Sequence, residues 1–256
     1  MKLCVLGSGS GGNCTLVYTD STALLVDAGF SGVEIEKRLS AIGFDPGRIK
    51  AVLLTHEHTD HLRGASVFSK KYRLPVYLTD GTYENANGAL KKKHVMKPQK
   101  IRSEESFTLG DIKVEPFSIP HDAAEPVAFL FTHNERRALT LTDVGSVTVR
   151  VVEKLRRAHL AVLESNHDTE LLKIGPYPLW LKQRVRGKLG HLSNDDCASL
   201  LKYGGGSSLA NVIFAHISAT NNNPDLVRIS VQTIMDEGSI KYEIARQDRP
   251  GEIHEV

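Results

Sequence analysis

The sequence has little cysteine, only three among 256 residues, and no two of them form a Cys-x-x-Cys pair. Cys4, Cys14 and Cys197 also leave an odd count, which argues against a disulfide framework and for a reducing compartment. Long apolar runs are missing too. No stretch approaches the roughly 20 apolar residues of a membrane span, and the apolar residues 3–6 end at Gly7, too early for a signal-peptide core. We therefore expect a cytoplasmic protein with no membrane partner.

An excess of charge is absent as well, because 32 basic residues face 30 acidic ones and give a formal net charge of +2. Such a balance does not identify a nucleic-acid binder, although carboxylates around a metal site could mask a basic rim. Hydrophobic residues make up 41% and charged residues 24%, which are ordinary values for a globular protein and argue against disorder. A chain of this length can bury one substantial core, as one large domain or as two closely packed halves.

Histidine and carboxylate are concentrated in one short stretch, residues 55–61, which reads Thr-His-Glu-His-Thr-Asp-His and follows the apolar residues 51–54. If residues 51–54 form a strand, alternation puts His56 and His58 on the same side and Glu57 on the other. A turn into a helix after His58 would bring Asp60 and His61 back toward the same point. Nitrogen and carboxylate ligands suit Zn, Mn or Fe. The alternative interpretation is a solvated polar loop.

Further acids and histidines follow other apolar strand candidates. The strands predicted at residues 23–26, 112–117, 137–141, 160–163 and 211–215 are followed by Asp27, His121, Asp143, Glu164 and His216. Ligands at several strand ends define a cleft along one edge of a sheet. Asp27 has two interpretations, either a cap for the amphipathic helix predicted at residues 33–42 or an acid that orients the ligands.

Two other segments carry polar groups without a single clear role. Residues 7–13 match the G-x-G-x-x-G spacing, but residues 14–18 favour a strand, so we predict a hairpin whose glycines serve a tight turn or a close approach to a phosphate or metal. Residues 171–190 interleave Tyr177 and Trp180 with cations, which suits either base stacking and phosphate contacts or a surface helix with an apolar anchor.

We also predict helices at residues 83–92 and after a cap at Ser193 or Asn194.

The ordered set at these strand ends resembles the metallo-β-lactamase-fold hydrolases over almost the whole chain. The resemblance implies an α/β (α+β) fold of four αββα layers, with residues 1–256 as a single domain. It implies a centre of two divalent metal ions, Zn or Mn with Fe also compatible. The first ion would be held by His56, His58 and His121 and the second by Asp60, His61 and His216, with Asp143 bridging them and Asp27 in support.

Shorter matches are similar to the bacterial YycJ/WalJ-type proteins, which are regarded as DNA exonucleases. They are residues 8–14, 163–166, 190–194, 216–218 and 220–224. The stretch between Asp143 and His216 is too short for the extra domain that larger nucleases of the superfamily insert there, so loops and residues 171–190 must hold the substrate. The residues expected to contact substrate are Ser8, Ser10, Asn13, Ser193, Asn194, Asn222, Lys182, Arg184 and Arg186.

The resemblance therefore implies metal-assisted hydrolysis of a phosphodiester, with DNA favoured over RNA and a 5′ to 3′ direction. Besides Asp60, it implies a catalytic pair in which His191, backed by Glu164, protonates the leaving oxygen or holds the scissile phosphate. One alternative is a small-molecule metallo-hydrolase acting on a cyclic phosphodiester, a thioester or a lactone. Another is a non-catalytic, metal-stabilised signalling partner.

Overall fold

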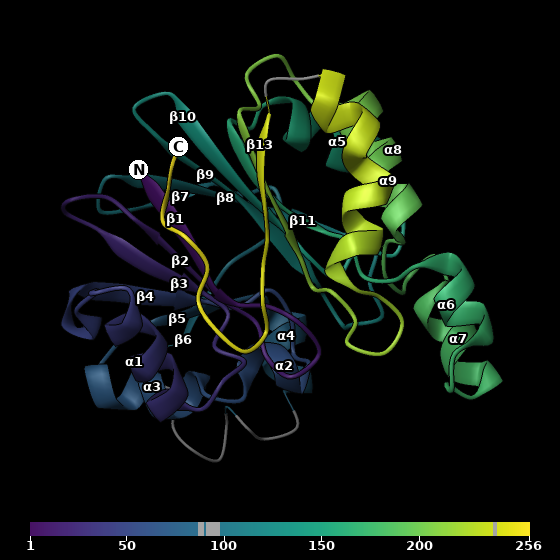
Figure 1. Ribbon diagram of the computed structural model, residues 1–256. Coiled ribbons are helices and arrows are strands. Elements are labelled where there is room, and N and C mark those ends of the chain that lie inside the picture. The colour runs from purple at the N-terminus through teal and green to yellow at the C-terminus, as the bar shows by residue number, and fades with distance from the viewer. Residues whose placement is uncertain (87–89, 91–97, 238–239) are drawn as a thin grey trace.

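Two β-sheets face each other between outer layers of helices in the computed structural model, which describes residues 1–86, 90, 98–237 and 240–256 (Figure 1). The first sheet has the strand order β14-β1-β2-β3-β4-β5-β6, with β1 Lys2–Gly7, β2 Cys14–Tyr18, β3 Ala23–Val26, β4 Ile49–Leu53, β5 Val76–Leu78, β6 Pro98–Lys100 and β14 His254–Glu255. The second has the order β13-β12-β11-β10-β9-β8-β7, with β7 Phe107–Leu109, β8 Ile112–Ser118, β9 Val127–His133, β10 Arg136–Leu141, β11 Leu160–Glu164, β12 Asn211–Ala215 and β13 Lys241–Ile244.

The helices cover the outer faces of both sheets and confirm the predicted αββα arrangement (Figure 1). The helices beside the first sheet are α1 Gly32–Ala41, α2 Thr59–Leu62, α3 Ala65–Tyr72 and α4 Asp80–Asn85, and a 3₁₀ turn spans Pro46–Arg48. Those against the second sheet are α5 Val149–Arg156, α8 Asn194–Gly204 and α9 Pro224–Glu237. The helices α6 Thr169–Ile174 and α7 Leu179–Val185 project beside the sandwich (Figure 1). No helix in the described part of the chain is long and apolar enough to span a membrane.

Both faces of the central strands are buried, which explains their near-continuous apolar runs. In β1, Leu3 and Val5 join the cluster between the sheets, while Cys4 and Leu6 join the cluster under α1 and α3. In β12, Val212 packs against the outer helices of the second sheet in the same alternating way. The core is therefore three apolar layers, one between the sheets and one under each set of helices.

The hairpin predicted around the glycine loop, residues 8–13, is present, because β1 and β2 pair antiparallel. The segment that follows β13 crosses to the first sheet, where β14 pairs with β1. On its way it supports the glycine loop, since Gly11 N donates to Gln247 Oε1 at 2.7 Å and Ser8 N donates to Arg246 O at 3.1 Å. The loop is thus held by a segment more than 230 residues away in sequence.

Two predicted helix caps and one predicted helix differ in how well the structure matches them. Ser193 is the cap of α8, since its Oγ accepts from Asp196 N at 3.1 Å. The capping interpretation of Asp27 is wrong, because the residue that caps α1 is Ser31, whose Oγ accepts from Glu34 N at 3.2 Å. The helix predicted at residues 83–92 is described only at its start, where α4 ends at Asn85; residues 87–89 and 91–92 lie outside the described part.

Candidate active site

The candidate ligands follow strands that run in matching directions toward one edge of the sandwich. β3 and β4 are parallel, as are β10 and β11, and β11 and β12. β8 runs in the direction of β10, because each is antiparallel to β9. The backbone turns sharply at three of these strand ends, where Asp27, Asp143 and His216 have φ of 61°, 60° and 55°. A left-handed conformation costs a non-glycine residue about 1–2 kcal/mol, and such strain concentrates at functional sites.

Three imidazoles form the first donor set. His56 Nε2 lies 3.0 Å from His58 Nδ1, and His121 Nε2 lies 3.2 Å from the same atom. His56 and His58 leave the chain just after β4 and His121 just after β8, so the two sheets each contribute to the set. Three nitrogens at this spacing suit one metal ion and leave its remaining coordination to other ligands.

The second donor set combines a carboxylate with two imidazoles. Asp60 Oδ2 lies 3.4 Å from His61 Nε2 and 3.6 Å from His216 Nε2. The short helix α2 makes this possible, because it turns Asp60 and His61 back toward the strand end. Asp143 joins both sets, with Oδ2 3.3 Å from His61 Nε2 and Oδ1 3.8 Å from His121 Nε2. The structure thus brings together all seven residues that the sequence suggested as ligands.

Four of these imidazoles are fixed by a hydrogen bond at Nδ1, which leaves Nε2 available to a metal ion. His121 Nδ1 lies 3.1 Å from Gly190 O. A carbonyl only accepts, so Nδ1 carries the proton and Nε2 keeps its lone pair for a metal. Three further histidines are held at Nδ1 in the same way, His56 by Thr55 Oγ1 at 2.9 Å, His61 by Asp27 Oδ2 at 2.8 Å and His216 by Glu164 Oε1 at 2.8 Å.

The ionised carboxylates and unpaired buried polar atoms of the site also fit a bound cation. Burial lowers the pKa of His61, but Asp143, Asp27 and Asp60 outweigh it and raise that pKa well above the usual value. Burial raises the pKa of Asp143, and His216 and His61 more than reverse the effect, so the carboxylate stays ionised. Asp143 Oδ2 and His216 Nε2 are buried without a hydrogen-bond partner among the described residues. Two buried polar atoms aimed at one cluster fit a divalent metal, which would satisfy both.

Glu164 links the donor sets to a further imidazole. It is fully buried, and its Oε1 lies 2.8 Å from Nδ1 of both His191 and His216, while Oε2 accepts from Val144 N at 2.9 Å and Leu192 N at 3.0 Å. Burial raises the pKa of Glu164, but His191 and His216 outweigh it and bring the pKa to about 2. An ionised Glu164 therefore holds both rings at Nδ1 and leaves the Nε2 of His191 for the pocket.

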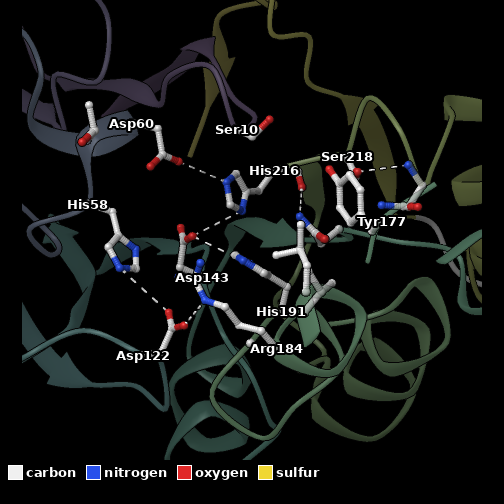
Figure 2. Close-up of a pocket in the computed structure, with 16 residues that line it drawn as sticks. Ser10, His58, Asp60, Asp122, Asp143, Tyr177, Arg184, His191, His216 and Ser218 are labelled. Atoms are coloured by element: carbon white, nitrogen blue, oxygen red, sulfur yellow. Dashed lines mark hydrogen bonds and ion pairs between the residues drawn. The ribbon is translucent and has the colours of Figure 1, made fainter. Parts of the chain in front are cut away.

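A cavity of about 360 Å³ opens over these groups (Figure 2). Its metal-facing wall includes His58, Asp60, Asp143, His191 and His216. The rest is lined by Ser10, Thr59, Asp122, Asn166, Tyr177, Leu181, Arg184, Val185, Gly190, Ser218 and Asn221. A volume of this size lies at the lower end of the range for small-molecule and cofactor sites.

The residues expected to contact substrate fall into two groups. Ser10 and Arg184 line the cavity, whereas Lys182 and Arg186 lie on the same helix segment outside it. The buried group, which bonds to protein atoms, comprises Ser8, Asn13, Ser193, Asn194 and Asn222. Asn13 Nδ2 lies 3.2 Å from Asp60 Oδ2, so the glycine loop approaches the second donor set, while Asn194 and Asn222 exchange amide hydrogen bonds at 3.0 and 2.8 Å.

Sequence reasoning missed Asp122 and Thr55. Asp122 Oδ1 lies 3.4 Å from His121 Nε2, and its Oδ2 pairs with Arg184. It therefore connects α7 to the first donor set. Asp122 directly follows His121 in the sequence, and Thr55 directly precedes His56. This adjacency to a candidate ligand is the sequence signal that could have identified both residues.

Comparisons with known proteins agree with this geometry. A family model described as the beta-lactamase superfamily domain matches residues 22–217. Exodeoxyribonuclease YycJ of Bacillus anthracis is 37% identical over 238 residues, covering 91% of this chain and 88% of the relative, and exodeoxyribonuclease WalJ of Streptococcus pneumoniae serotype 2 is 35% identical over 237 residues, covering 90% and 86%. The metallo-β-lactamase-fold protein YhfI of Bacillus subtilis has a TM-score of 0.75 over 99% of both chains at 19% identity. The chain belongs to the metallo-β-lactamase superfamily, resembles its YycJ/WalJ exonuclease branch, and is a metal-dependent hydrolase.

Proposed function

We propose that this protein is a two-metal phosphodiesterase that acts as a DNA exonuclease in the 5′ to 3′ direction. The observation that carries the proposal is the place of Asp143 between two three-residue donor sets, at the base of an open cavity. The exodeoxyribonuclease names of the relatives support a nucleic-acid substrate. The segment from Glu170 to Lys188 supports it too, because it carries five basic residues and one acidic residue beside the cavity.

The roles of the donors follow from their positions. The first ion would bind His56, His58 and His121, the second would bind Asp60, His61 and His216, and Asp143 would contact both. These ligands suit Zn²⁺ or Mn²⁺ and also accept Fe²⁺. When bound, the ions would supply Lewis acidity toward the phosphate oxygens and lower the pKa of a water molecule.

Two side chains act on the protons of the reaction, Asp60 at the attacking water and His191 at the leaving oxygen. A water oxygen forms the new bond to phosphorus as the bond to the leaving sugar oxygen breaks. Asp60, at the cavity floor, accepts a hydrogen bond from the attacking water, and the released proton passes to solvent. His191, held at Nδ1 by Glu164, donates from Nε2 to the leaving oxygen. Arg184 at the rim contacts the phosphates that flank the scissile one.

The test uses protein stripped with a chelator and reloaded with Mn²⁺ or Zn²⁺. Single- and double-stranded DNA and RNA, labelled at the 5′ or the 3′ end, are incubated with it and the products are resolved by size. We expect 5′-labelled DNA to release labelled mononucleotide from the first time point, while 3′-labelled DNA shortens stepwise. Asp60→Asn protein purified in parallel controls for contaminating nucleases.

Other results would redirect the assignment. Equal or faster cleavage of RNA would replace DNA as the substrate, and internal fragments would replace an exonuclease with an endonuclease. Hydrolysis of a small chromogenic diester without any cleavage of polymer would favour a small-molecule hydrolase. Failure on every substrate by protein that retains both ions would favour a non-catalytic partner.

A further inference from the structure

The cavity has two chemically different halves. One half carries the imidazoles and carboxylates of the donor sets with His191. The other is lined by Tyr177, Leu181 and Val185, with the Ser218 hydroxyl at its edge. Figure 2 shows Tyr177 and Ser218 beside each other, across the cavity from Asp60 and His58. The metal-facing half accounts for phosphate chemistry, whereas the half around Tyr177 has no part in it.

Local structure explains how the second half is built. Leu181 and Val185 are four residues apart on α7, so they share one face of the helix. Pro176 and Pro178 flank Tyr177, and each fixes the backbone φ of its own position. Tyr177 is half-buried but belongs to none of the three apolar clusters of the described core. Its ring therefore contributes to the cavity wall rather than to core packing.

We propose that the Tyr177 half of the cavity binds the nucleobase of the terminal nucleotide, next to the phosphate that is cleaved. This inference rests on the proposed nuclease function and names the part of the substrate that the site reads. A base has two flat apolar faces, which match an aromatic ring and the side chains of Leu181 and Val185. A phosphate offers no apolar face and a deoxyribose ring is small and puckered, so neither covers an aromatic and aliphatic wall as a flat base does.

Polar groups at the same end match the edge of a base. Ser218 and Asn221 line the cavity beside Tyr177. The Ser218 hydroxyl oxygen already accepts from Asn221 N at 3.1 Å and Thr220 N at 3.4 Å, so the hydroxyl is left to donate to a base. The side-chain amide of Asn221 is buried, and both its nitrogen and its oxygen lack a hydrogen-bond partner among the described residues. Turning this amide toward a base edge would break no hydrogen bond with the protein. Tyr177 supplies the stacking face, and these groups supply hydrogen bonds at the rim of the base.

Binding of the terminal base in this half of the cavity requires that the base be unpaired. A base can enter the cavity only when it is unpaired and unstacked from its neighbour, because the wall takes the place of the next base. Unstacking and unpairing cost a few kcal/mol in a duplex and less at a frayed or single-stranded end. The enzyme therefore prefers single-stranded or frayed ends over blunt duplex ends.

The experiment compares two single-stranded oligonucleotides that differ only at the terminal residue, which is either thymidine or an abasic tetrahydrofuran with the same phosphate. Both ends are tested, and kcat/KM for release of the first residue is measured with the Mn²⁺-loaded protein. We expect wild-type protein to prefer the intact terminus roughly five- to hundredfold, the range that stacking of a base on an aromatic side chain spans. Tyr177→Leu brings this ratio close to one, whereas Tyr177→Phe keeps it.

Tyr203→Leu is the matched control, because Tyr203 is 67% exposed on α8 and does not line the cavity. It keeps the wild-type ratio. A wild-type ratio near one overturns the proposal without any variant, and so does a Tyr177→Leu protein that folds, retains its metal and still prefers the intact terminus. If wild-type protein cleaves neither oligonucleotide but hydrolyses a small diester, the nuclease function itself fails, which is a distinct result.

Discussion

Glu164 Oε1 lies 2.8 Å from Nδ1 of His216, a candidate metal ligand whose Nε2 faces Asp60. The same oxygen lies 2.8 Å from Nδ1 of His191, which lines the cavity. One buried carboxylate therefore orients both a metal ligand and the proposed proton donor. The orientation of the two rings is coupled through a single side chain.

Glu164→Gln is expected to lower both metal affinity and turnover by about 10–100-fold. The carboxylate accepts four hydrogen bonds, from His191, His216, Val144 N and Leu192 N, and an amide can accept at only one of its two ends. Chelator competition and kcat measure the two losses. Glu153→Gln, at an exposed position on α5, should change neither. An unchanged metal affinity for Glu164→Gln would contradict the coupling.

His191→Ala should lower kcat by about 10²–10⁴-fold, the usual contribution of a positioned general acid, while both ions stay bound. His191 belongs to neither of the two three-residue donor sets beside Asp143, so metal content is the discriminating measurement. Elemental analysis of the purified variant gives the ion count, and single-turnover kinetics gives the chemical step. Cleavage of DNA at the wild-type rate would remove His191 from the mechanism.

Asp60→Asn and His61→Ala should each abolish hydrolysis and reduce the bound metal from two ions to one. Asp60 borders the cavity, so its replacement leaves the apolar clusters intact. Circular dichroism of Asp60→Asn should therefore match the wild type, while elemental analysis of each variant shows the lost ion. Retention of full activity by either variant would refute the assignment of the second donor set.

Neutralising Lys182, Arg184 and Arg186 to glutamine should reduce cleavage of DNA and make it less sensitive to salt, because fewer cations are then available to the phosphates. Turnover of a small chromogenic diester should persist in the Lys182→Gln/Arg186→Gln double variant, whose two positions lie outside the cavity. Arg184→Gln is tested separately because Arg184 also pairs with Asp122. Lys202→Gln, on the exposed surface of α8, is the control. An equal loss on both substrates in the double variant would argue against a DNA-binding surface.

Glu115 gives a prediction about stability and pH. Its carboxylate accepts two hydrogen bonds from Arg157, at 2.8 and 2.9 Å, and pairs with Lys154. The hydrogen bonds from Arg157 outweigh burial and lower the pKa of Glu115 to about 2. A lowered folded-state pKa adds stability above the unfolded pKa, near 4.3, and that stability is lost as the pH falls toward about 2.

Glu115→Gln should therefore lower the free energy of unfolding by about 1–3 kcal/mol at pH 7, and the difference from the wild type should shrink between pH 5 and pH 2. Urea unfolding at several pH values measures both effects. Glu105→Gln, at an exposed position, serves as the control. A difference that stayed constant across this pH range would show that the ionised form of Glu115 contributes nothing.

The candidate donor residues and the strands that precede them could be predicted from sequence because both depend on local pattern, whereas the αββα fold and the division of the donors between two ions came from the resemblance to the metallo-β-lactamase-fold hydrolases. Apolar runs of four to six residues mark buried strands, and an acid or histidine directly after such a run must lie at a strand end. His56, His58, Asp143 and His216 could be found in this way. The helix α2, which turns Asp60 and His61 back, follows from the same short polar segment.

Local pattern could not predict which polar side chains face substrate. Asn13 and Asn194 are expected from the sequence to contact substrate, yet in the structure the side chain of Asn13 bonds to Asp60 and that of Asn194 to Asn222. That outcome depends on contacts between segments distant in the chain, such as Gly11 with Gln247. Such contacts produce no recognisable pattern in the sequence around the residues that make them.

The sequence by itself determined the donor chemistry and the strand ends that carry it, because ligand type and strand period are local properties. Only the tertiary structure decided that Glu164 orients two histidines at once, that Asp122 joins α7 to the first donor set, and that Tyr177 faces the cavity while Trp180 on the adjoining helix stays 65% exposed. The physical reason is that burial and orientation are set by the packing of both sheets and their loops together.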